Sequence, residues 1–383
     1  MKKQTILVDA TNIKSGGGLV HLKSILNSNI FINSKYNIHV LGSKKTLKTL
    51  NNIYIKKNSW FFEQSFIFQF IWKLLFLKFY LFKHNFDLIF VPGGWFLFKY
   101  RFKVIILSQN FILFNQDIID QYKYSFQYIK FIILKYLHFR SINKSDGVIY
   151  LSKYVLDFVN NIKNIQNNNH IVISHGANED FNFTERNLDS IDLKKEINLV
   201  YSSHVDYYKK QNNIIDEVIY LNHQGYKINL NLVGTYNKKY LKVIKNKISK
   251  YEFINFLYYL DHVELIELFK KMNVAVFAST CENLPITLIE YMKSNIPIIC
   301  NKIQPCVEVL QNGSVYFDIN KKYDFADNLL KLLNDINLQK KITKISYNNS
   351  RKYNWDFCAI NTFKFLENSI DKALIKNEKF KTS

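Results

Sequence analysis

Short apolar runs alternate with helical patterns from one end of the chain to the other. In the first half, the runs that predict buried strands are Thr5–Val8, Ile38–Leu41, Leu88–Val91, Val104–Leu107, Val148–Leu151 and Ile171–Ile173. Strands that are apolar throughout and separated by helices are typical of parallel sheets covered on both faces. The alternation therefore predicts an α/β architecture.

A polar stretch without periodicity, at about 176–195, interrupts this pattern and predicts a linker. After it the predicted strands are Asn198–Tyr201, Asn229–Val233, Ile254–Leu257, Val274–Phe277 and Ile296–Cys300. Helices fit about Asn212–Asn222, Val263–Lys271, Pro285–Lys293 and the tail from Asp324 onward. A chain of 383 residues also exceeds what one hydrophobic core usually supports.

We therefore expect two Rossmann-like doubly wound domains facing a central cleft. The N-terminal domain would span 1–185 and the C-terminal domain 186–350. A helical tail, 351–383, would pack back toward the N-terminal domain.

Glycine and proline are scarce, with 11 and 4 copies, against average usages of about 7% and 5%. Five glycines fall in Gly16–Gly18 and Gly93-Gly94, and three prolines, Pro285, Pro297 and Pro305, fall in one short stretch. We therefore expect these clusters to mark turns whose backbone conformation matters for function.

The formal net charge is +21, and residues 1–150 carry 21 Lys and Arg against 6 Asp and Glu. A basic surface suits an anionic partner, such as a phosphate-bearing substrate or an anionic lipid. No nucleic-acid motif is recognisable, and the aromatic residues of this half lie in apolar helices, so we expect no nucleic-acid partner.

Two helical stretches of the N-terminal half, Phe61–Phe82 and Lys123–Arg140, mix lysines with many aromatic and aliphatic residues. Neither is uninterrupted over the roughly 20 residues that a membrane span needs. Two interpretations stay open. The helices pack on the sheet with snorkelling lysines, or they lie on an anionic membrane as peripheral contacts.

The four cysteines form no CxxC pair, and no His, Asp and Glu cluster has metal-ligand spacing, so we expect no metal and no cofactor. The N-terminus leads directly into a strand without a secretory signal. The expected location is the cytoplasm, including the inner face of the cell membrane.

The sharpest motif pairs two glutamates, Glu282 and Glu290, across a predicted strand-to-helix turn. Pro285 suits the first turn of the helix, and the free amides there form a site for a diphosphate. Glu282 precedes the helix and can accept hydrogen bonds from sugar hydroxyls, while Glu290 can reach a ribose diol. Taken alone, the pair would equally fit an ordinary turn with glutamates facing solvent.

This turn, with Ala278-Ser279-Thr280 before it and Ser294–Ile299 after it, resembles the E-x7-E region of retaining glycosyltransferases of family 4, which have the GT-B architecture. The similarity extends over nearly the whole chain. Further matching segments are Gly16–Leu22, Val91–Gly94, Leu107–Asn110, Ile149–Ser152, Val172–Gly176, Pro305–Val309, Val315–Asp318 and the Trp355 helix.

The resemblance implies a nucleotide-sugar donor, UDP- or GDP-linked, and a glycan or lipid-linked acceptor. By it, Glu282, Lys209 and Glu290 would be the catalytic residues, contacting the transferred sugar, the phosphates and the ribose. The implied donor-binding set is Gly17, Gly18, His204, Lys210, Gly234, Asn283, Leu284, Pro285 and Ile286. The implied acceptor-binding set is Gln109, Asn110 and His175.

Several residues depart from the family pattern. His204 stands where arginine is common, and a neutral imidazole binds phosphate more weakly than guanidinium. Gln109 stands where histidine is common and cannot act as a general base. Asn283, Asn295 and Tyr258 stand where glycine is frequent.

The leading hypothesis is a retaining hexosyltransferase that acts on a lipid-linked or cell-surface polysaccharide precursor. The alternative, motivated by His204 and Gln109, is a catalytically inactive glycosyltransferase-like binding subunit.

Overall fold

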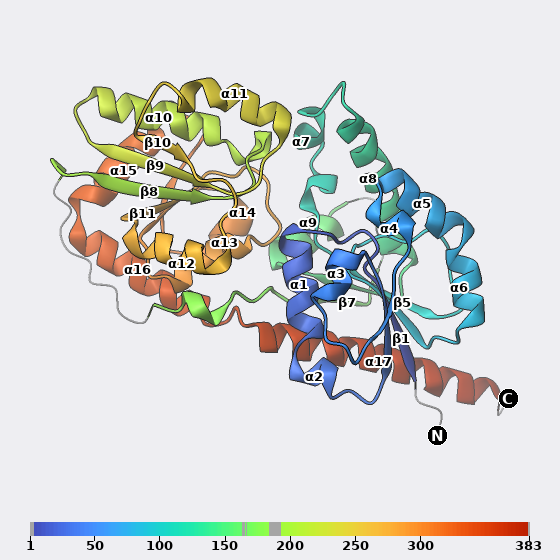
Figure 1. The fold of residues 1–383 in the computed structure, drawn as a ribbon. Helices are drawn as coiled ribbons and strands as arrows, with labels where there is room; N and C mark the ends of the chain where they lie inside the picture. The colour runs from blue at the N-terminus through green and yellow to red at the C-terminus, as the bar shows by residue number, and fades with distance from the viewer. Residues whose placement is uncertain (1–3, 163–164, 166, 184–192, 382–383) are drawn as a thin grey trace. The chain divides into compact units, whose positions relative to one another are not determined.

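The computed structural model describes residues 4–162, 165, 167–183 and 193–381, with only the helical backbone for 372–381. The chain divides into two compact units. The first comprises Met1–Gly176 together with Trp355–Ser383, and the second comprises Ala177–Asn354. Each unit is a parallel sheet with helices on both faces (Figure 1).

The first unit is built on a seven-stranded sheet in the order β3-β2-β1-β4-β5-β6-β7, with every pairing parallel. Its strands are β1 (Thr5–Asp9), β2 (Asn37–Leu41), β3 (Ile55–Lys57), β4 (Leu88–Val91), β5 (Lys103–Ser108), β6 (Gly147–Tyr150) and β7 (His170–Val172). The inner strands are buried except at the first residue of β1, β2 and β5, as expected for a sheet covered on two faces.

Helices connect these strands, and the last helix of the chain returns to this unit. They are α1 (Gly16–Leu26), α2 (Asn29–Ile32), α3 (Lys44–Lys48), α4 (Trp60–Glu63), α5 (Phe66–Leu75), α6 (Leu77–Lys83), η1 (Phe111–Phe114), α7 (Gln116–Asp120), α8 (Phe126–Lys144), α9 (Lys153–Asn160) and α17 (Trp355–Lys381). Helix α17 packs against α1 and α2 and under β4 and β5 (Figure 1).

The second unit has a six-stranded parallel sheet in the order β10-β9-β8-β11-β12-β13. Its strands are β8 (Ile197–Ser202), β9 (Ile228–Val233), β10 (Ile254–Phe256), β11 (Val274–Phe277), β12 (Ile298–Asn301) and β13 (Val315–Phe317). Its helices are η2 (Glu179–Phe181), η3 (Tyr207–Lys209), α10 (Gln211–His223), α11 (Lys238–Ile248), α12 (His262–Lys271), α13 (Ile286–Lys293), α14 (Gln304–Leu310), α15 (Asp324–Asn334) and α16 (Ile336–Ser350).

In each sheet the strand order reverses once, between β1 and β4 in the first unit and between β8 and β11 in the second. Chain segments that leave two such strands run to opposite sides of the sheet. A crevice therefore opens at their carboxyl ends, and ligands of open α/β sheets bind there.

The predicted Rossmann-like α/β architecture and all eleven predicted strands are confirmed. Two strands were missed. β3 and β13 are three-residue strands at the edges of their sheets, and β3 contains Lys56 and Lys57, which are typical of an edge strand but weaken the apolar signal.

The expectation of one helix over Phe61–Phe82 is wrong. The stretch is divided into α4, α5 and α6, with breaks at Gln64-Ser65 and at Phe76. The first break has a visible cause, because the Gln64 main-chain oxygen accepts hydrogen bonds from Lys14 Nζ at 2.6 Å and from Gln69 Nε2 at 3.1 Å.

Snorkelling is also wrong for Lys73, whose side chain is fully buried. Its Nζ lies 2.7 Å from Asp9 Oδ2, and Asp9 also accepts a hydrogen bond from the Thr11 hydroxyl at 2.7 Å. The same Nζ lies 4.1 Å from the centre of the Trp95 ring. This buried ion pair joins the end of β1 to α5 and to the turn after β4.

We predict that Lys73→Ala lowers the free energy of unfolding by about 3–5 kcal/mol, because Asp9 would be left as an unpaired buried charge. Urea unfolding followed by circular dichroism measures the change. Lys78→Ala is the matched control. Lys78 is exposed on α6 and its Nζ only lies over the Phe98 ring at 4.1 Å, so the loss should stay near 0.5 kcal/mol. Equal losses in the two variants would contradict the role of the pair.

Candidate functional site

The loops that follow β8 and β11 meet at the point where the second sheet reverses its strand order. Lys209 ends η3 after β8, and Glu282 lies in the loop after β11. Lys209 Nζ forms an ion pair with Glu282 Oε1, and both side chains are 11% exposed. The structure thus brings together two of the three predicted catalytic residues, 73 positions apart in sequence.

Main-chain hydrogen bonds hold this pair in place. The Tyr208 carbonyl accepts from the Thr280 amide at 2.8 Å and from its hydroxyl at 3.0 Å, which joins the two loops directly. The Tyr201 hydroxyl donates to the Lys209 carbonyl at 2.5 Å. Lys209 and Glu282 are therefore presented by a rigid frame.

The neighbouring thiol is inert. Burial, and then the charge of Glu282, raise the pKa of Cys281 to about 12. A protonated, buried thiol is neither a nucleophile nor a metal ligand at neutral pH. Across the described residues, no group of three His, Cys, Asp or Glu side chains could hold a metal ion.

The predicted donor-binding residues after β8 and β9 adopt conformations that bring loops close together. Lys210 has a left-handed backbone, with φ 58°, and precedes α10. Gly234 has φ +139°, and a Cβ there would lie 2.2 Å from the Ser203 carbonyl oxygen. Only glycine fits at this position.

His204 is held by a hydrogen bond between its Nδ1 and the Thr235 hydroxyl at 2.7 Å. Burial lowers the pKa of His204, against the opposing effect of Asp206, whose Oδ2 lies 3.8 Å from Nε2. The ring is therefore mainly neutral near pH 7 and offers hydrogen bonds to a ligand rather than a positive charge.

Glu290 lies in the second turn of α13, whose first residue, Ile286, follows the N-cap Pro285. Asn283 and Leu284 are buried in the loop before it. Burial raises the pKa of Glu290 to about 7, so this carboxyl changes its charge in the physiological range.

Two of the departures from the family pattern have left-handed backbones, Tyr258 with φ 55° and Asn295 with φ 51°. The Tyr258 carbonyl accepts from the Gly234 amide at 2.7 Å. Asn295 Nδ2 donates to the Phe183 carbonyl at 2.5 Å. Both positions would favour glycine, and this chain keeps the conformation without it.

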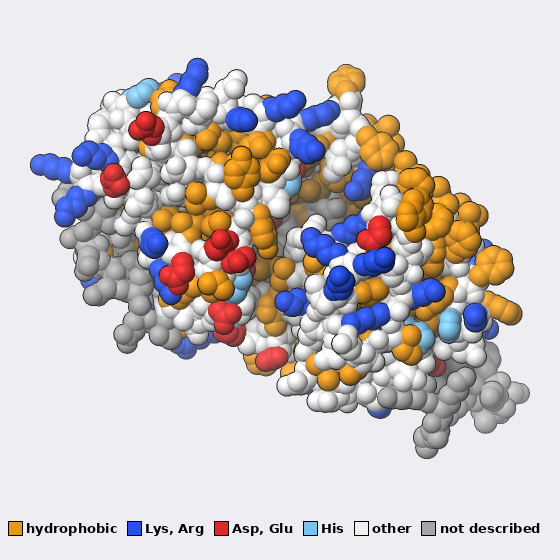
Figure 2. Space-filling model, in the orientation of Figure 1, with side chains coloured by type: hydrophobic (Ala, Val, Ile, Leu, Met, Phe, Trp, Pro, Cys, Tyr) orange, Lys and Arg blue, Asp and Glu red, His pale blue; other side chains and the backbone are white. Residues whose placement is uncertain are grey.

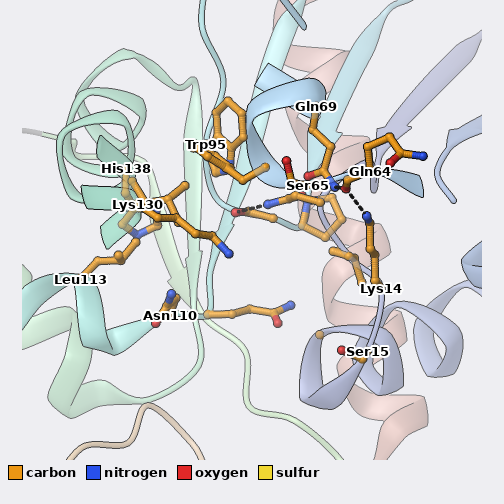
Figure 3. Close-up of a pocket in the computed structure, with 18 residues that line it drawn as sticks. Lys14, Ser15, Gln64, Ser65, Gln69, Trp95, Asn110, Leu113, Lys130 and His138 are labelled. Atoms are coloured by element: carbon orange, nitrogen blue, oxygen red, sulfur yellow. Dashed lines mark hydrogen bonds between the residues drawn. The ribbon is translucent and has the colours of Figure 1, made fainter. Parts of the chain in front are cut away.

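In the first unit, a cavity of about 480 Å³ opens at the reversal point between β1 and β4 (Figure 3). Gln109 and Asn110, two of the predicted acceptor residues, line it together with Gly18. A Cβ on Gly18 would lie 3.2 Å from Gln109 Oε1, so the glycine turn and this loop are in close contact. Gly17 lies beside it, exposed in the first turn of α1.

His175, the third predicted acceptor residue, does not line this cavity. It is 4% exposed, with its Nδ1 2.8 Å from the Nδ1 of His21, and both rings contact Trp355 at the start of α17. The two histidines join α1, the end of the first sheet and the C-terminal helix.

Several polar or charged lining residues were not predicted as site residues from the sequence, among them Lys14, Gln64, Trp95 and Lys130. Lys14 and Trp95 lie in the loops that follow β1 and β4, so their positions after strand ends were a usable signal. Lys130 was identified only as part of a basic-aromatic helix.

Residues 184–349 match the family described as Glycosyl transferases group 1. An uncharacterized glycosyltransferase of Methanocaldococcus jannaschii is 24% identical over 234 residues. That alignment covers 59% of this chain and 61% of the relative, so the chain spans about three fifths of the length of this curated protein.

Among solved structures, sucrose-phosphate synthase from Thermosynechococcus elongatus superposes with a TM-score of 0.70 at 13% identity, covering 99% of this chain and 100% of that one. Anabaena HepE in complex with UDP and glucose gives 0.68 at 14% identity, covering 95% and 100%. Residues 184–349 are thus similar to a glycosyltransferase group 1 domain, and the superpositions show that the chain has a GT-B fold. Lys209, Glu282 and Glu290 all lie inside the matched residues of this domain.

The histidine pair predicts acid sensitivity of the first unit of this GT-B fold. Burial lowers the pKa of His21 to about 3, and burial together with His21 lowers the pKa of His175 well below 6.5. The unfolded chain takes up these protons below about pH 6.5 and the folded one does not. Stability should therefore fall as the pH drops from 6.5 toward 3, by about 1.4 kcal/mol per pH unit for each histidine.

Urea midpoints at pH 7, 6 and 5 measure this slope. His21→Leu should make it shallower, whereas the exposed His223→Leu on α10 should leave it unchanged. Identical slopes in the two variants would show that the pair does not control acid unfolding.

Proposed function

We propose that this protein is a retaining glycosyltransferase that moves a hexose from a UDP- or GDP-linked sugar to a lipid-linked or cell-surface polysaccharide precursor. The observation that carries the proposal is the Lys209–Glu282 pair, with both side chains 11% exposed, at the strand-order reversal of the group 1 domain. The ammonium group of Lys209 suits a phosphate, and the carboxylate of Glu282 suits the hydroxyls of an adjacent sugar.

In the proposed complex, Lys209 binds the donor phosphates, helped by the amides at the start of α13. Glu282 accepts hydrogen bonds from hydroxyls of the transferred sugar, and Glu290 accepts them from the ribose. Lys210, His204, Gly234 and the Asn283–Ile286 turn shape the rest of the donor site. That HepE was solved with UDP and glucose supports this choice of donor class.

The proposed reaction retains the anomeric configuration. The bond between the anomeric carbon and the β-phosphate oxygen breaks, and an acceptor hydroxyl oxygen attacks from the same face. The acceptor proton passes to the departing β-phosphate oxygen. Lys209 stabilises the charge that grows on the diphosphate, an interaction that is stronger in the transition state than in the bound donor. Gln109 and Asn110 orient the acceptor and take no proton.

We predict that Glu282→Ala lowers turnover of the donor, by transfer or by hydrolysis, at least about a hundredfold, since it removes both the sugar contact and the partner of Lys209. Release of UDP or GDP from the corresponding sugar nucleotides measures it. Glu267→Ala on α12 is the control, because Glu267 is exposed and forms an ion pair with Lys270 of the same helix. Undiminished turnover in Glu282→Ala with a normal melting temperature would refute the catalytic assignment.

The inactive binding subunit remains the second candidate, and the neutral His204 and the Gln109 side chain favour it. It would bind sugar nucleotides weakly or not at all while retaining glycan binding. Calorimetry with UDP and GDP separates the two: nucleotide binding that Lys209→Met abolishes supports the enzyme.

The lipid-linked acceptor and a location on the inner face of the cell membrane find support in an exposed aromatic face of the first unit. Figure 2 shows hydrophobic side chains gathered over α5, α6 and α8. No helix within the described residues is long and apolar enough to cross a membrane. Residues of this aromatic face are Trp60, Ile67, Phe68, Leu74, Leu75, Phe76, Phe79, Phe82, Phe126, Ile129, Ile132, Ile133 and Tyr136.

The α8 members of the aromatic face recur every three or four residues, so they lie along one side of the helix. Phe79 and Phe82 on α6 are 76% and 82% exposed, and exposed Lys78 and Lys83 accompany them. Aromatic rings with adjacent lysines are the composition that binds the interface of an anionic bilayer. A large exposed apolar patch rarely lacks an interaction role.

We predict that Phe79→Ser/Phe82→Ser reduces co-sedimentation with phosphatidylglycerol vesicles at low salt by at least about tenfold, because two apolar rings leave the interface. Val263→Ser on α12, which is 68% exposed in the second unit, should change nothing. Wild-type protein that stays in the supernatant would contradict the membrane contact.

A further inference from the structure

We propose that the cavity of the first unit binds an acceptor sugar that carries a phosphate or carboxylate group, with Lys14 and Lys130 as the residues that recognise the charge. This inference rests on the proposed function in one respect, namely that the ligand of this cavity is the acceptor. The Lys209–Glu282 pair, which is proposed to bind the donor, lies in the other unit and contributes nothing to the argument.

The lining of the cavity is one-sided in charge. Eighteen of the described residues line it, and none of these is Asp or Glu. Figure 3 shows Lys14 and Lys130 entering from opposite sides, from the loop after β1 and from α8. Neither lysine belongs to an ion pair between described residues, in contrast to Lys73 and Lys209.

Both ammonium groups are partly removed from water. Burial lowers the pKa of Lys130. For Lys14, burial lowers the pKa most, Glu63 opposes this, and the positive charge of Lys130 lowers it further. Glu63 lies outside the cavity and accepts hydrogen bonds from the Lys44 amide at 2.7 Å and from Asn58 Nδ2 at 2.8 Å. Two lysines that repel one another in a partly dry cavity are stabilised by a bound anion.

Three polar atoms of the same lining are buried without a hydrogen-bond partner in the described structure. They are Trp95 Nε1, Gln109 Nε2 and Asn12 Oδ1, and the Trp95 side chain is only 2% exposed. Two donors and one acceptor at the wall of a cavity match sugar hydroxyls, which both accept and donate. Leaving such atoms unpaired is costly, which indicates that a ligand or water satisfies them.

The shape of the site fits the same class of ligand. A Cβ on Gly93 would lie 1.9 Å from Asn12 Oδ1, so the glycine turn after β4 leaves room for the Asn12 amide. Lys14 Nζ is fixed by its 2.6 Å hydrogen bond to the Gln64 carbonyl and keeps further protons to donate. A volume of about 480 Å³ is in the range of small-molecule sites.

The experiment uses the full-length protein and calorimetry with four probes: glucose 6-phosphate, glucuronate, glucose and inorganic phosphate. We expect at least one of the charged sugars to bind at least tenfold more tightly than both glucose and inorganic phosphate. In Lys14→Met/Lys130→Met its affinity should fall at least tenfold. Lys135→Met, on the same helix and bonded to exposed Gln116, should keep it.

Binding of UDP-glucose and GDP-mannose provides the second readout. Lys209→Met should abolish sugar-nucleotide binding and leave charged-sugar binding unchanged, and Lys14→Met/Lys130→Met should do the reverse. Loss of sugar-nucleotide binding in the double variant would assign the cavity to the donor phosphates and overturn the inference. So would equal binding of glucose and both charged sugars, or inorganic phosphate as the tightest ligand.

Failure of the proposed function gives a different result. The wild type would then bind no sugar nucleotide, while the charged sugar still binds in a manner that depends on Lys14 and Lys130. The recognition of charge would stand in that case, and the ligand would no longer be an acceptor for transfer.

Discussion

The parallel arrangement of every strand is the constraint on which the rest of this molecule depends. Parallel strands need crossover connections, so all carboxyl ends of one sheet lie at the same edge. Where the strand order reverses, the outgoing loops separate and a crevice forms. In the second unit that point holds Lys209 and Glu282, and in the first it holds the cavity of Lys14 and Gln109.

Lysine serves three different physical tasks in these two units. Lys73 is buried against Asp9 and stabilises the end of β1. Lys209 is paired with Glu282 in a partly exposed site, where an incoming phosphate can compete for it. Lys14 and Lys130 face each other across a cavity without a carboxylate in its lining. The basic excess of residues 1–150 is therefore not a uniform solvated surface, and part of it lines a cavity.

The sequence predicted most of the fold because buried parallel strands are mainly apolar, and eleven such runs were recognisable. It predicted the Glu282–Glu290 turn from spacing and resemblance, and the glycine-like positions Tyr258 and Asn295 indeed have positive φ. It missed β3 and β13, although the equally short edge strands β7 and β10 were predicted; in β3, Lys56 and Lys57 weaken the apolar signal.

The tertiary partners of single side chains could not be predicted in this way. Nothing local distinguishes Lys73, which is buried, from Lys78, which is exposed five positions later on the next helix. Likewise, the partner of His175 is His21, 154 positions away, and only the fold brings their rings together. Contacts between residues far apart in sequence decide whether a polar residue has a structural or a functional role. The sequence therefore predicts that a site lies at the strand ends, but not which side chains pair there.

The electrostatics of the proposed donor site follow from its unusual composition. His204 is mainly neutral, because burial lowers its pKa more than Asp206 raises it, so Lys209 carries the larger part of the phosphate charge. Lys209 must then balance both Glu282 and a diphosphate. A donor that enters brings more negative charge than one ammonium neutralises, which increases the importance of the uncharged donors at the start of α13. The pairing of Lys209 with Glu282 also gives a physical reason for a carboxylate beside the proposed phosphate site. Before the donor binds, Glu282 compensates the Lys209 charge in a partly buried loop, and afterwards its oxygens are available to sugar hydroxyls.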